Sequence, residues 1–232
     1  MYLGYGIDIY YIILVVPALV FSMWAQTKVT STFNKYSRIR TGSGMTGYEA
    51  ARRILSANGL YNVNVERVSG KLTDHYDPKS NVIRLSDSVF NSNSVAAVGV
   101  AAHEAGHAVQ YATQYAPIKV RTAIIPITNI GSTLSIPLVL IGFFMGLQPL
   151  VNFGILLFAT VAVFQLVTLP VEFNASRRAV DALEMGGTMA DDEMKAVKKV
   201  LSAAAMTYVA ALAVSVANLL RLVIRFGGRN RD

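Results

Sequence analysis

The chain has 232 residues, of which 53% are hydrophobic, only 15% are charged and none is cysteine. Because a soluble domain carries about 25% charged residues, this composition indicates a membrane protein, and the lack of cysteine excludes disulfides, thiolate metal sites and cysteine nucleophiles. The formal net charge of +7 could suggest nucleic acid as a partner, but no basic block or basic–aromatic pattern supports nucleic-acid binding. Lysine and arginine enrichment in cytoplasmic loops explains the charge instead.

The first apolar run covers residues 7–24, close to the roughly 20 residues that cross a bilayer. A cleaved signal peptide is the competing interpretation. The start of the run lacks Lys and Arg, contains Asp8 and is followed by no small-residue cleavage site. We therefore expect residues 1–24 to form a retained transmembrane helix.

Residues 25–122 are polar and mix helical with extended patterns. Thr46 and Glu49 have the spacing of a capping box, which predicts the start of a helix. Asn58 and Gly59 then predict its end, because both residues accept the left-handed conformation of a helix C-terminus.

Three short strands are predicted next, at residues 63–68, 72–76 and 82–85. Turn-forming residues separate these short runs from one another, as is typical of strands joined by turns. Residues 94–115 follow, with a helical pattern that is apolar on every side. A helix of that kind is buried.

No charged residue lies between Arg121 and Glu172. Within this interval, the apolar runs 123–145 and 150–169 are separated by a Gly/Gln/Pro break. Two transmembrane helices joined by a tight turn fit this pattern, because each run has about the length of a membrane span.

Residues 171–200 are polar again, and Asp191 begins another helix. The last apolar run, residues 201–220, is rich in Ala and Ser. It predicts a fourth transmembrane helix or a re-entrant helix, followed by a basic tail to residue 232.

The segments 25–122 and 171–200 together hold 17 of the 21 Lys and Arg residues. The positive-inside rule places both segments in the cytoplasm. Four full spans would then put the basic tail, which contains Arg221 and Arg225, on the outer side, against the rule. The side of the C-terminus therefore stays open.

His103, Glu104 and His107 form a His-Glu-x-x-His motif within the predicted buried helix. Residues four apart lie on one helix face, so both imidazoles can bind a single zinc ion. Zinc lowers the pKa of a bound water, and the neighbouring carboxylate is placed to accept its proton as general base. The motif predicts a catalytic zinc site.

Gly106 lies between the two histidines of this motif. Glycine costs about 1 kcal/mol relative to Ala within a helix. Gly106 therefore indicates either that another element approaches the helix closely at this point or that the helix tolerates a glycine here.

A catalytic zinc ion usually has three protein ligands and one open position. No histidine follows His107, so the third ligand should be a carboxylate. Glu172 is the leading candidate, because the apolar hairpin returns it to the side of the histidines. The alternatives are a salt bridge with Arg177 or an interfacial carboxylate.

The chain resembles the YugP-like bacterial membrane zinc metallopeptidases over nearly its whole length. The resemblance rests on the N-terminal span and on segments 72–78 (LTDHYDP), 103–108 (HEAGHA) and 172–179 (EFNASRRA). It implies a gluzincin-type site in which His103, His107 and Glu172 bind zinc and Glu104 is the general base.

The segment around Glu172 is also similar to the Glu-x-x-x-Asp motif of the HtpX and CAAX prenyl endopeptidases. In this chain Ser176 occupies the Asp position. The departure puts a carboxylate next to the zinc ligands in doubt, and Ser176 or Asn174 is expected to replace it by hydrogen bonding.

Other candidates have weaker signals. His75 in the predicted 72–76 strand and Tyr208 in the Ala-rich last helix could stabilise an oxyanion, although structural roles explain both residues too. Arg177 and Arg178 could orient Glu172 or contact lipid phosphates.

We therefore expect a polytopic α-helical membrane protein with a small α+β zincin-like cytoplasmic catalytic domain. The five segments are 1–24, 25–122, 123–170, 171–200 and 201–232. The expected function is that of a zinc endopeptidase with one catalytic Zn²⁺, multi-pass in the bacterial plasma membrane, whose partners are the lipid bilayer and a polypeptide substrate. Its substrates would be membrane-associated or misfolded polypeptides, by analogy with the HtpX relatives. A zinc-binding scaffold or regulator with little turnover is the alternative, and partner proteins and oligomeric state stay open.

Overall fold

A computed structural model of the chain describes residues 8–227 and is mostly helical. Ile7, Arg229 and Arg231, which belong to the first apolar run and to the basic tail, lie outside the described residues. The chain divides into two compact units. The first contains Met1–Gln26, Lys119–Leu169 and Thr207–Asp232, and the second contains Thr27–Ile118 and Pro170–Met206.

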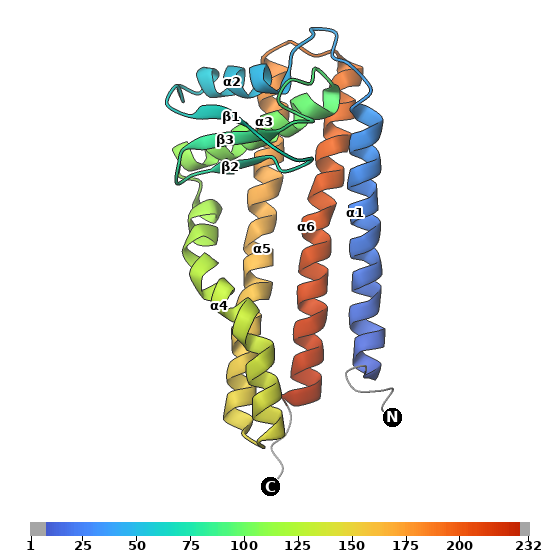
Figure 1. Cartoon of the computed structure of the whole chain (residues 1–232), viewed down its shortest axis with the longest axis vertical. Helices are drawn as coiled ribbons and strands as arrows, with labels where there is room; N and C mark the ends of the chain where they lie inside the picture. The colour runs from blue at the N-terminus through green and yellow to red at the C-terminus, as the bar shows by residue number, and fades with distance from the viewer. Residues whose placement is uncertain (1–7, 228–232) are drawn as a thin grey trace. The chain divides into compact units, whose positions relative to one another are not determined.

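The second unit holds all three strands of the described chain and two complete helices, drawn close together in Figure 1. These elements are α2 (Gly47–Ala57), β1 (Asn64–Val68), β2 (His75–Asp77), β3 (Val82–Ser86) and α3 (Val95–Ala112). Helix α2 packs against α3, and α3 also contacts β2 and β3. The core of this unit forms where the apolar faces of these elements meet, around Leu55, Ile83 and Leu85.

The predicted capping box at the start of α2 is confirmed. The hydroxyl of Thr46 accepts a hydrogen bond from the backbone N–H of Glu49 at 3.3 Å. The Glu49 carboxylate accepts one from the backbone N–H of Thr46 at 2.8 Å. Asn58 caps the other end of the helix, as predicted. Both helix ends therefore follow from local sequence.

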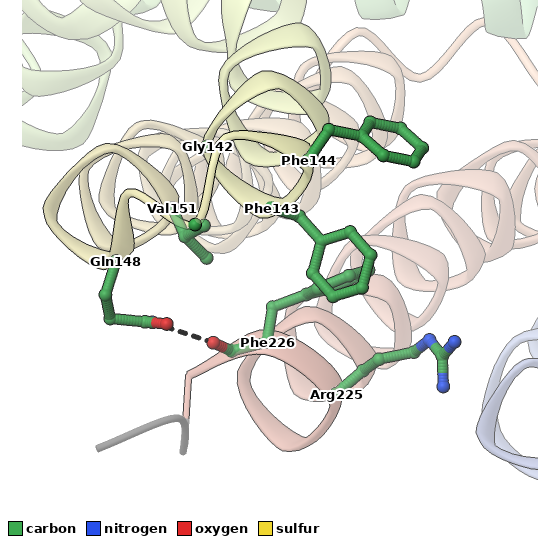
Figure 2. A pocket seen from close by; sticks show the side chains of 8 residues that line it. Gly142, Phe143, Phe144, Gln148, Val151, Arg225 and Phe226 are labelled. Carbon is green, nitrogen blue, oxygen red and sulfur yellow. Dashed lines mark hydrogen bonds between the residues drawn. The ribbon is translucent and has the colours of Figure 1, made fainter. Parts of the chain in front are cut away.

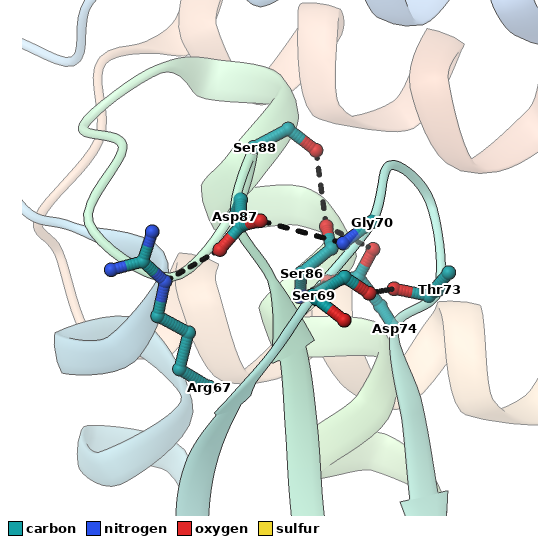
Figure 3. Close-up of polar contacts among 8 residues, drawn as sticks. All are labelled: Arg67, Ser69, Gly70, Thr73, Asp74, Ser86, Asp87 and Ser88. Atoms are coloured by element: carbon teal, nitrogen blue, oxygen red, sulfur yellow. Dashed lines mark hydrogen bonds and ion pairs between the residues drawn. The ribbon is translucent and has the colours of Figure 1, made fainter.

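The sheet has the strand order β1-β3-β2, with β1 parallel and β2 antiparallel to the central strand β3. The prediction of a strand over residues 72–76 is wrong at its start, because β2 begins only at His75. The carboxylate of Asp74 accepts hydrogen bonds from the backbone N–H (2.7 Å) and the hydroxyl (2.9 Å) of Ser86 (Figure 3). The side chain of Asp74 thus binds the end of β3, at a position where backbone pairing between two strands was predicted.

Helix α3 begins after Ser94, whose hydroxyl accepts a hydrogen bond from the backbone N–H of Ala97 at 3.2 Å. Its residues are mostly small, and most of them are fully buried. The prediction of a buried helix at 94–115 is therefore confirmed, except that the helix ends at Ala112.

Each apolar run predicted to span the membrane lies in a helix that is long and apolar enough to do so. These helices are α1 (Val16–Tyr36, preceded by a π-helical turn at Tyr11–Val15), α4 (Ala116–Phe144), α5 (Gln148–Met185) and α6 (Asp191–Phe226). Helix α5 continues without interruption through Pro170. The polar segment that contains Glu172 is thus an extension of an apolar helix.

Within the first unit, α4 and α5 form a closely packed hairpin. A Cβ atom added to Gly154 on α5 would lie 2.8 Å from the backbone oxygen of Ser135 on α4. Small residues at such positions allow helix backbones to approach each other in membrane proteins. The hairpin therefore depends on the absence of a side chain at residue 154.

The turn of this hairpin meets the C-terminal end of α6 (Figure 2). The Gln148 side chain donates a hydrogen bond to the backbone oxygen of Phe226 at 2.8 Å, and the rings of Phe143 and Phe226 are 5.3 Å apart. Helix α6 is thus one uninterrupted helix that reaches this turn.

The end of α6 also binds the start of the described chain. The carboxylate of Asp8, only 6% exposed, lies 2.9 Å from Nη2 of Arg221 and 3.2 Å from Nε of Arg225. Buried charges are stable only when they are paired, and this carboxylate faces two guanidinium groups. Two of the four arginines after residue 220 therefore share one carboxylate as their partner.

Replacing Gly154 by valine should destabilise the α4–α5 hairpin by about 1–3 kcal/mol, because the added side chain overlaps the backbone of α4. Thermal unfolding of the purified protein in detergent would measure this loss. Leu156→Val, at a position on α5 that is 65% exposed, is the matched control and should change the melting temperature little. Equal melting temperatures for the two variants would contradict the packing argument.

Candidate metal centre

Three side chains from helices α3 and α5 converge in the second unit. His103 and His107 lie one turn apart on α3, and Glu172 lies on α5. Oε2 of Glu172 is 3.3 Å from Nε2 of His103 and 3.5 Å from Nε2 of His107. The carboxylate is 3% exposed, and both imidazoles are partly buried.

This donor set fits zinc. One ligand atom from each of the three residues can be chosen so that all lie within 4.8 Å of one another. Two ligand atoms about 2.1 Å from a tetrahedral zinc ion are themselves about 3.4 Å apart, which matches both imidazole–carboxylate distances. Two imidazoles and one carboxylate are also the protein ligands of many catalytic zinc sites, which leave one position open.

The other ring nitrogen of each histidine has a hydrogen-bond partner as well. Nδ1 of His103 is 3.1 Å from the hydroxyl of Ser176, and Nδ1 of His107 is 3.0 Å from Oε1 of Gln110. Such contacts hold a ligand imidazole in a fixed orientation. Both Nε2 atoms are therefore directed toward Glu172.

The two helices approach each other closely at Gly106. A Cβ atom at this position would lie 2.6 Å from the backbone oxygen of Ala175 on α5. Of the two interpretations that the sequence left open, close approach of another element is the one observed. This contact brings Glu172, one turn before Ala175, within reach of the histidines.

Glu104 is 8% exposed and lies on α3 next to His103. Burial opposes protonation of His107, but the negative charges of Glu172 and Glu104 beside it raise its pKa. Burial also raises the pKa of Asp74, against the hydrogen bonds from Ser86, and repulsion from Glu104 adds to this shift. The general-base candidate is thus close to the histidines and to a second carboxylate.

Of the three residues expected to assist the zinc ligands, Ser176, Asn174 and Arg177, Ser176 contacts the side chain of a ligand, His103, directly. The side chain of Asn174 accepts hydrogen bonds from Gln110 and from Arg178. Arg177 is exposed and lines a shallow apolar groove between α5 and α6. Oε2 of Glu172 lies close to the imidazoles of both histidines. A salt bridge with Arg177 was the alternative that the sequence left open.

Of the two oxyanion candidates, only His75 belongs to the second unit, and it is not part of the group that could hold a metal. His75 is exposed, and its Nδ1 is 2.8 Å from the backbone oxygen of Thr73. The ring of its neighbour Tyr76 packs against the ring of Tyr111 on α3, with the planes tilted by 57° and the centroids 5.5 Å apart. Successive strand side chains point to opposite faces. Tyr208 is partly buried on the part of α6 that belongs to the first unit.

The sequence predicts no role for Gln110 or Asp74. Gln110 is fully buried on α3, three residues after His107, and a polar residue at that spacing in a mostly apolar helix was the available signal. Asp74 lies within the 72–78 segment that carries the family resemblance, but its contact with Ser86 depends on how two strands meet.

The chain matches the protein family described as "Putative neutral zinc metallopeptidase" over residues 11–227. It is also 49% identical over 223 residues to "Putative membrane protease YugP" of Bacillus subtilis (strain 168), covering 96% of this chain and 99% of that protein. No solved structure matches the chain. The two matches confirm the family resemblance that the sequence motifs indicated.

Gly106→Ala should weaken zinc binding, because a methyl group at this position pushes α5 and its carboxylate away from the histidines. The free energy of zinc binding should become less favourable by about 1–3 kcal/mol, the usual cost of overpacking. Chelator competition on the detergent-solubilised protein would measure it.

Gly99→Ala on the same helix is the matched control, because the nearest atoms to the added Cβ belong to the side chain of Val197, at 3.3 Å or more, and none to a backbone. If both variants bind zinc as tightly as the wild type, the spacing between α3 and α5 does not control the metal centre.

Proposed function

Because the chain belongs to this zinc metallopeptidase family, we propose that it is a membrane-embedded, zinc-dependent endopeptidase. The observation that carries the proposal is the convergence of His103, His107 and Glu172 beside the buried carboxylate of Glu104. A purely structural zinc site usually has four protein ligands and needs no base.

His103, His107 and Glu172 would hold the zinc ion through two Nε2 atoms and a carboxylate oxygen. When bound, zinc supplies Lewis-acid activation of water and of the scissile carbonyl. Glu104 accepts the proton of the attacking water and returns it to the leaving amine, as a general base that then acts as an acid. Burial of Glu104 limits its contact with bulk water, which suits this role.

The sheet next to α3 supports a zincin-like arrangement for peptide binding. Strand β2 lies at the edge of the sheet, and β3 is the only described strand that pairs with it. An extended peptide can add to such an edge through backbone hydrogen bonds. Because β2 contacts α3, a peptide bound there would run beside the helix that carries both histidines.

Membrane-associated or misfolded polypeptides are the proposed substrates. On α5, Glu172 follows an uncharged stretch of membrane-span length with no break in the helix. A carboxylate at that point of an apolar helix suits chains that emerge from a bilayer or lie on it. The relative described as a membrane protease supports the same location.

We propose that the metal centre faces the cytoplasm and that all four long helices span the membrane. Segments 25–122 and 171–200 then lie inside, in keeping with their many basic residues. The C-terminal end of α6 lies outside, where Asp8 pairs with Arg221 and Arg225. This basic end departs from the positive-inside rule, and the one carboxylate lowers its net charge by one.

Glu104→Gln should keep zinc while cleavage of a generic unfolded polypeptide falls by about 100- to 10,000-fold, because the neutral amide accepts no proton. Metal analysis and a fluorogenic cleavage assay on the same preparation would measure the two quantities. Glu184→Gln, an exposed carboxylate on α5 that pairs with Lys198, is the control and should cleave normally.

Retained cleavage by Glu104→Gln would exclude Glu104 as the base. A wild-type protein that binds zinc stoichiometrically but cleaves no substrate would favour the scaffold or regulator instead.

Single cysteines can test the orientation, because the chain has none of its own. In intact cells, a membrane-impermeant thiol reagent should modify Met145→Cys at the exposed α4–α5 turn. It should modify Lys79→Cys, between β2 and β3, only after the membrane is permeabilised. The reverse labelling pattern would place the metal centre on the outer side.

A further inference from the structure

The side-chain amide of Gln110 is completely buried, and both its oxygen and its nitrogen contact other polar groups. Its Oε1 is 3.0 Å from Nδ1 of His107. Its Nε2 donates to the backbone oxygen of Val171 at 2.8 Å and to Oδ1 of Asn174 at 3.0 Å. A buried amide in such a network is stable because its polar atoms are satisfied.

The partner on α5 determines which way this amide points. The backbone oxygen of Val171 can only accept a hydrogen bond, so the NH₂ end of Gln110 must face α5. The carbonyl end then faces His107, and it too can only accept. Nδ1 of His107 must therefore carry the proton. In a neutral imidazole this leaves the lone pair on Nε2, the atom that lies 3.5 Å from Glu172.

The other end of the network is also fixed. Nε of Arg178 donates to Oδ1 of Asn174 at 2.8 Å. A guanidinium group has donors only, so Oδ1 of Asn174 must point toward it, and the same oxygen is available to Gln110. The guanidinium group lies over the ring of Tyr115, 6.0 Å from its centroid. The network thus runs from a donor-only group to an acceptor-only group, and neither amide can flip without losing contacts.

The other histidine lacks this constraint. The Ser176 hydroxyl beside Nδ1 of His103 can donate or accept, so that contact is compatible with either tautomer. Gln110 therefore selects one tautomer of His107, whereas Ser176 selects neither tautomer of His103.

We propose that Gln110 is a positioning residue of the metal centre. It holds His107 in the tautomer that presents Nε2 to the metal, and it ties the backbone next to Glu172 to helix α3. The second ligand histidine and the carboxylate ligand are thereby fixed by one side chain. The inference rests on the proposed zinc centre, but the state of the His107 ring can be measured without zinc.

Two substitutions separate the parts of this role. Gln110→Leu removes both the acceptor for His107 and the donor for Val171. Gln110→Glu keeps an acceptor for His107 but has no N–H group for Val171. Gln148→Leu is the matched control, because it removes a glutamine hydrogen bond to a backbone oxygen in the first unit.

Three measurements follow on detergent-solubilised protein: zinc affinity by chelator competition, the melting temperature of the metal-free form, and the ring ¹⁵N signals of its histidines at a pH high enough for the rings to be neutral. The chain has only three histidines, so their ring signals can be assigned by replacing each in turn.

Gln110→Leu should lower zinc affinity by about 10- to 100-fold, the usual effect of losing such a partner. In the metal-free variant, the His107 signals should change from the Nδ1–H tautomer to a mixture. Gln110→Glu should keep the Nδ1–H tautomer, and Gln148→Leu should change neither quantity.

An unchanged His107 tautomer in Gln110→Leu would overturn the inference even if zinc affinity fell, since the loss would then be structural. If Gln110→Leu does not fold, Gln110→Glu decides, because loss of the Nδ1–H tautomer there contradicts the proposed role of the acceptor. Wild-type protein that binds no zinc would contradict the proposed function, while the tautomer measurement would still test Gln110.

Discussion

The close approach of α3 and α5 at Gly106 is the constraint on which the rest of the metal centre depends. With no side chain at residue 106, the helix backbones come near enough for Glu172 to meet both histidines. Ser176 and Gln110 make their contacts across the same helix pair. Because all of these groups share one interface, a change in the helix spacing would alter every one of them together.

The membrane and the metal centre are joined by helix α5. One half of the helix is uncharged and packs in the α4–α5 hairpin, and the other half carries Glu172. A buried carboxylate is costly unless opposite charges or hydrogen-bond donors surround it, and a metal ion held between Glu172 and the two imidazoles of α3 would supply that charge. A site built this way combines a long apolar stretch with a polar centre on one helix.

Local features of the fold were predictable from the sequence because they depend on neighbouring residues. The capping box at Thr46, the buried helix around His103 and the long apolar helices all follow from spacing and composition. The strand predicted at residues 72–76 failed in part, since the side chain of Asp74 binds the end of β3. Propensity describes what a segment favours alone, and a contact with another segment can override it.

The sequence by itself determined that His103 and His107 share one face of a helix, because residues four apart do so. It also indicated a carboxylate as third ligand, since no histidine follows His107, and a family with the same expectation. Only the tertiary structure decided how that carboxylate reaches the histidines and what orients them. His103 and Ser176 are 73 residues apart, and Asp8 and Arg221 are 213 apart. Such contacts are set by how helices pack, and no local periodicity records that packing.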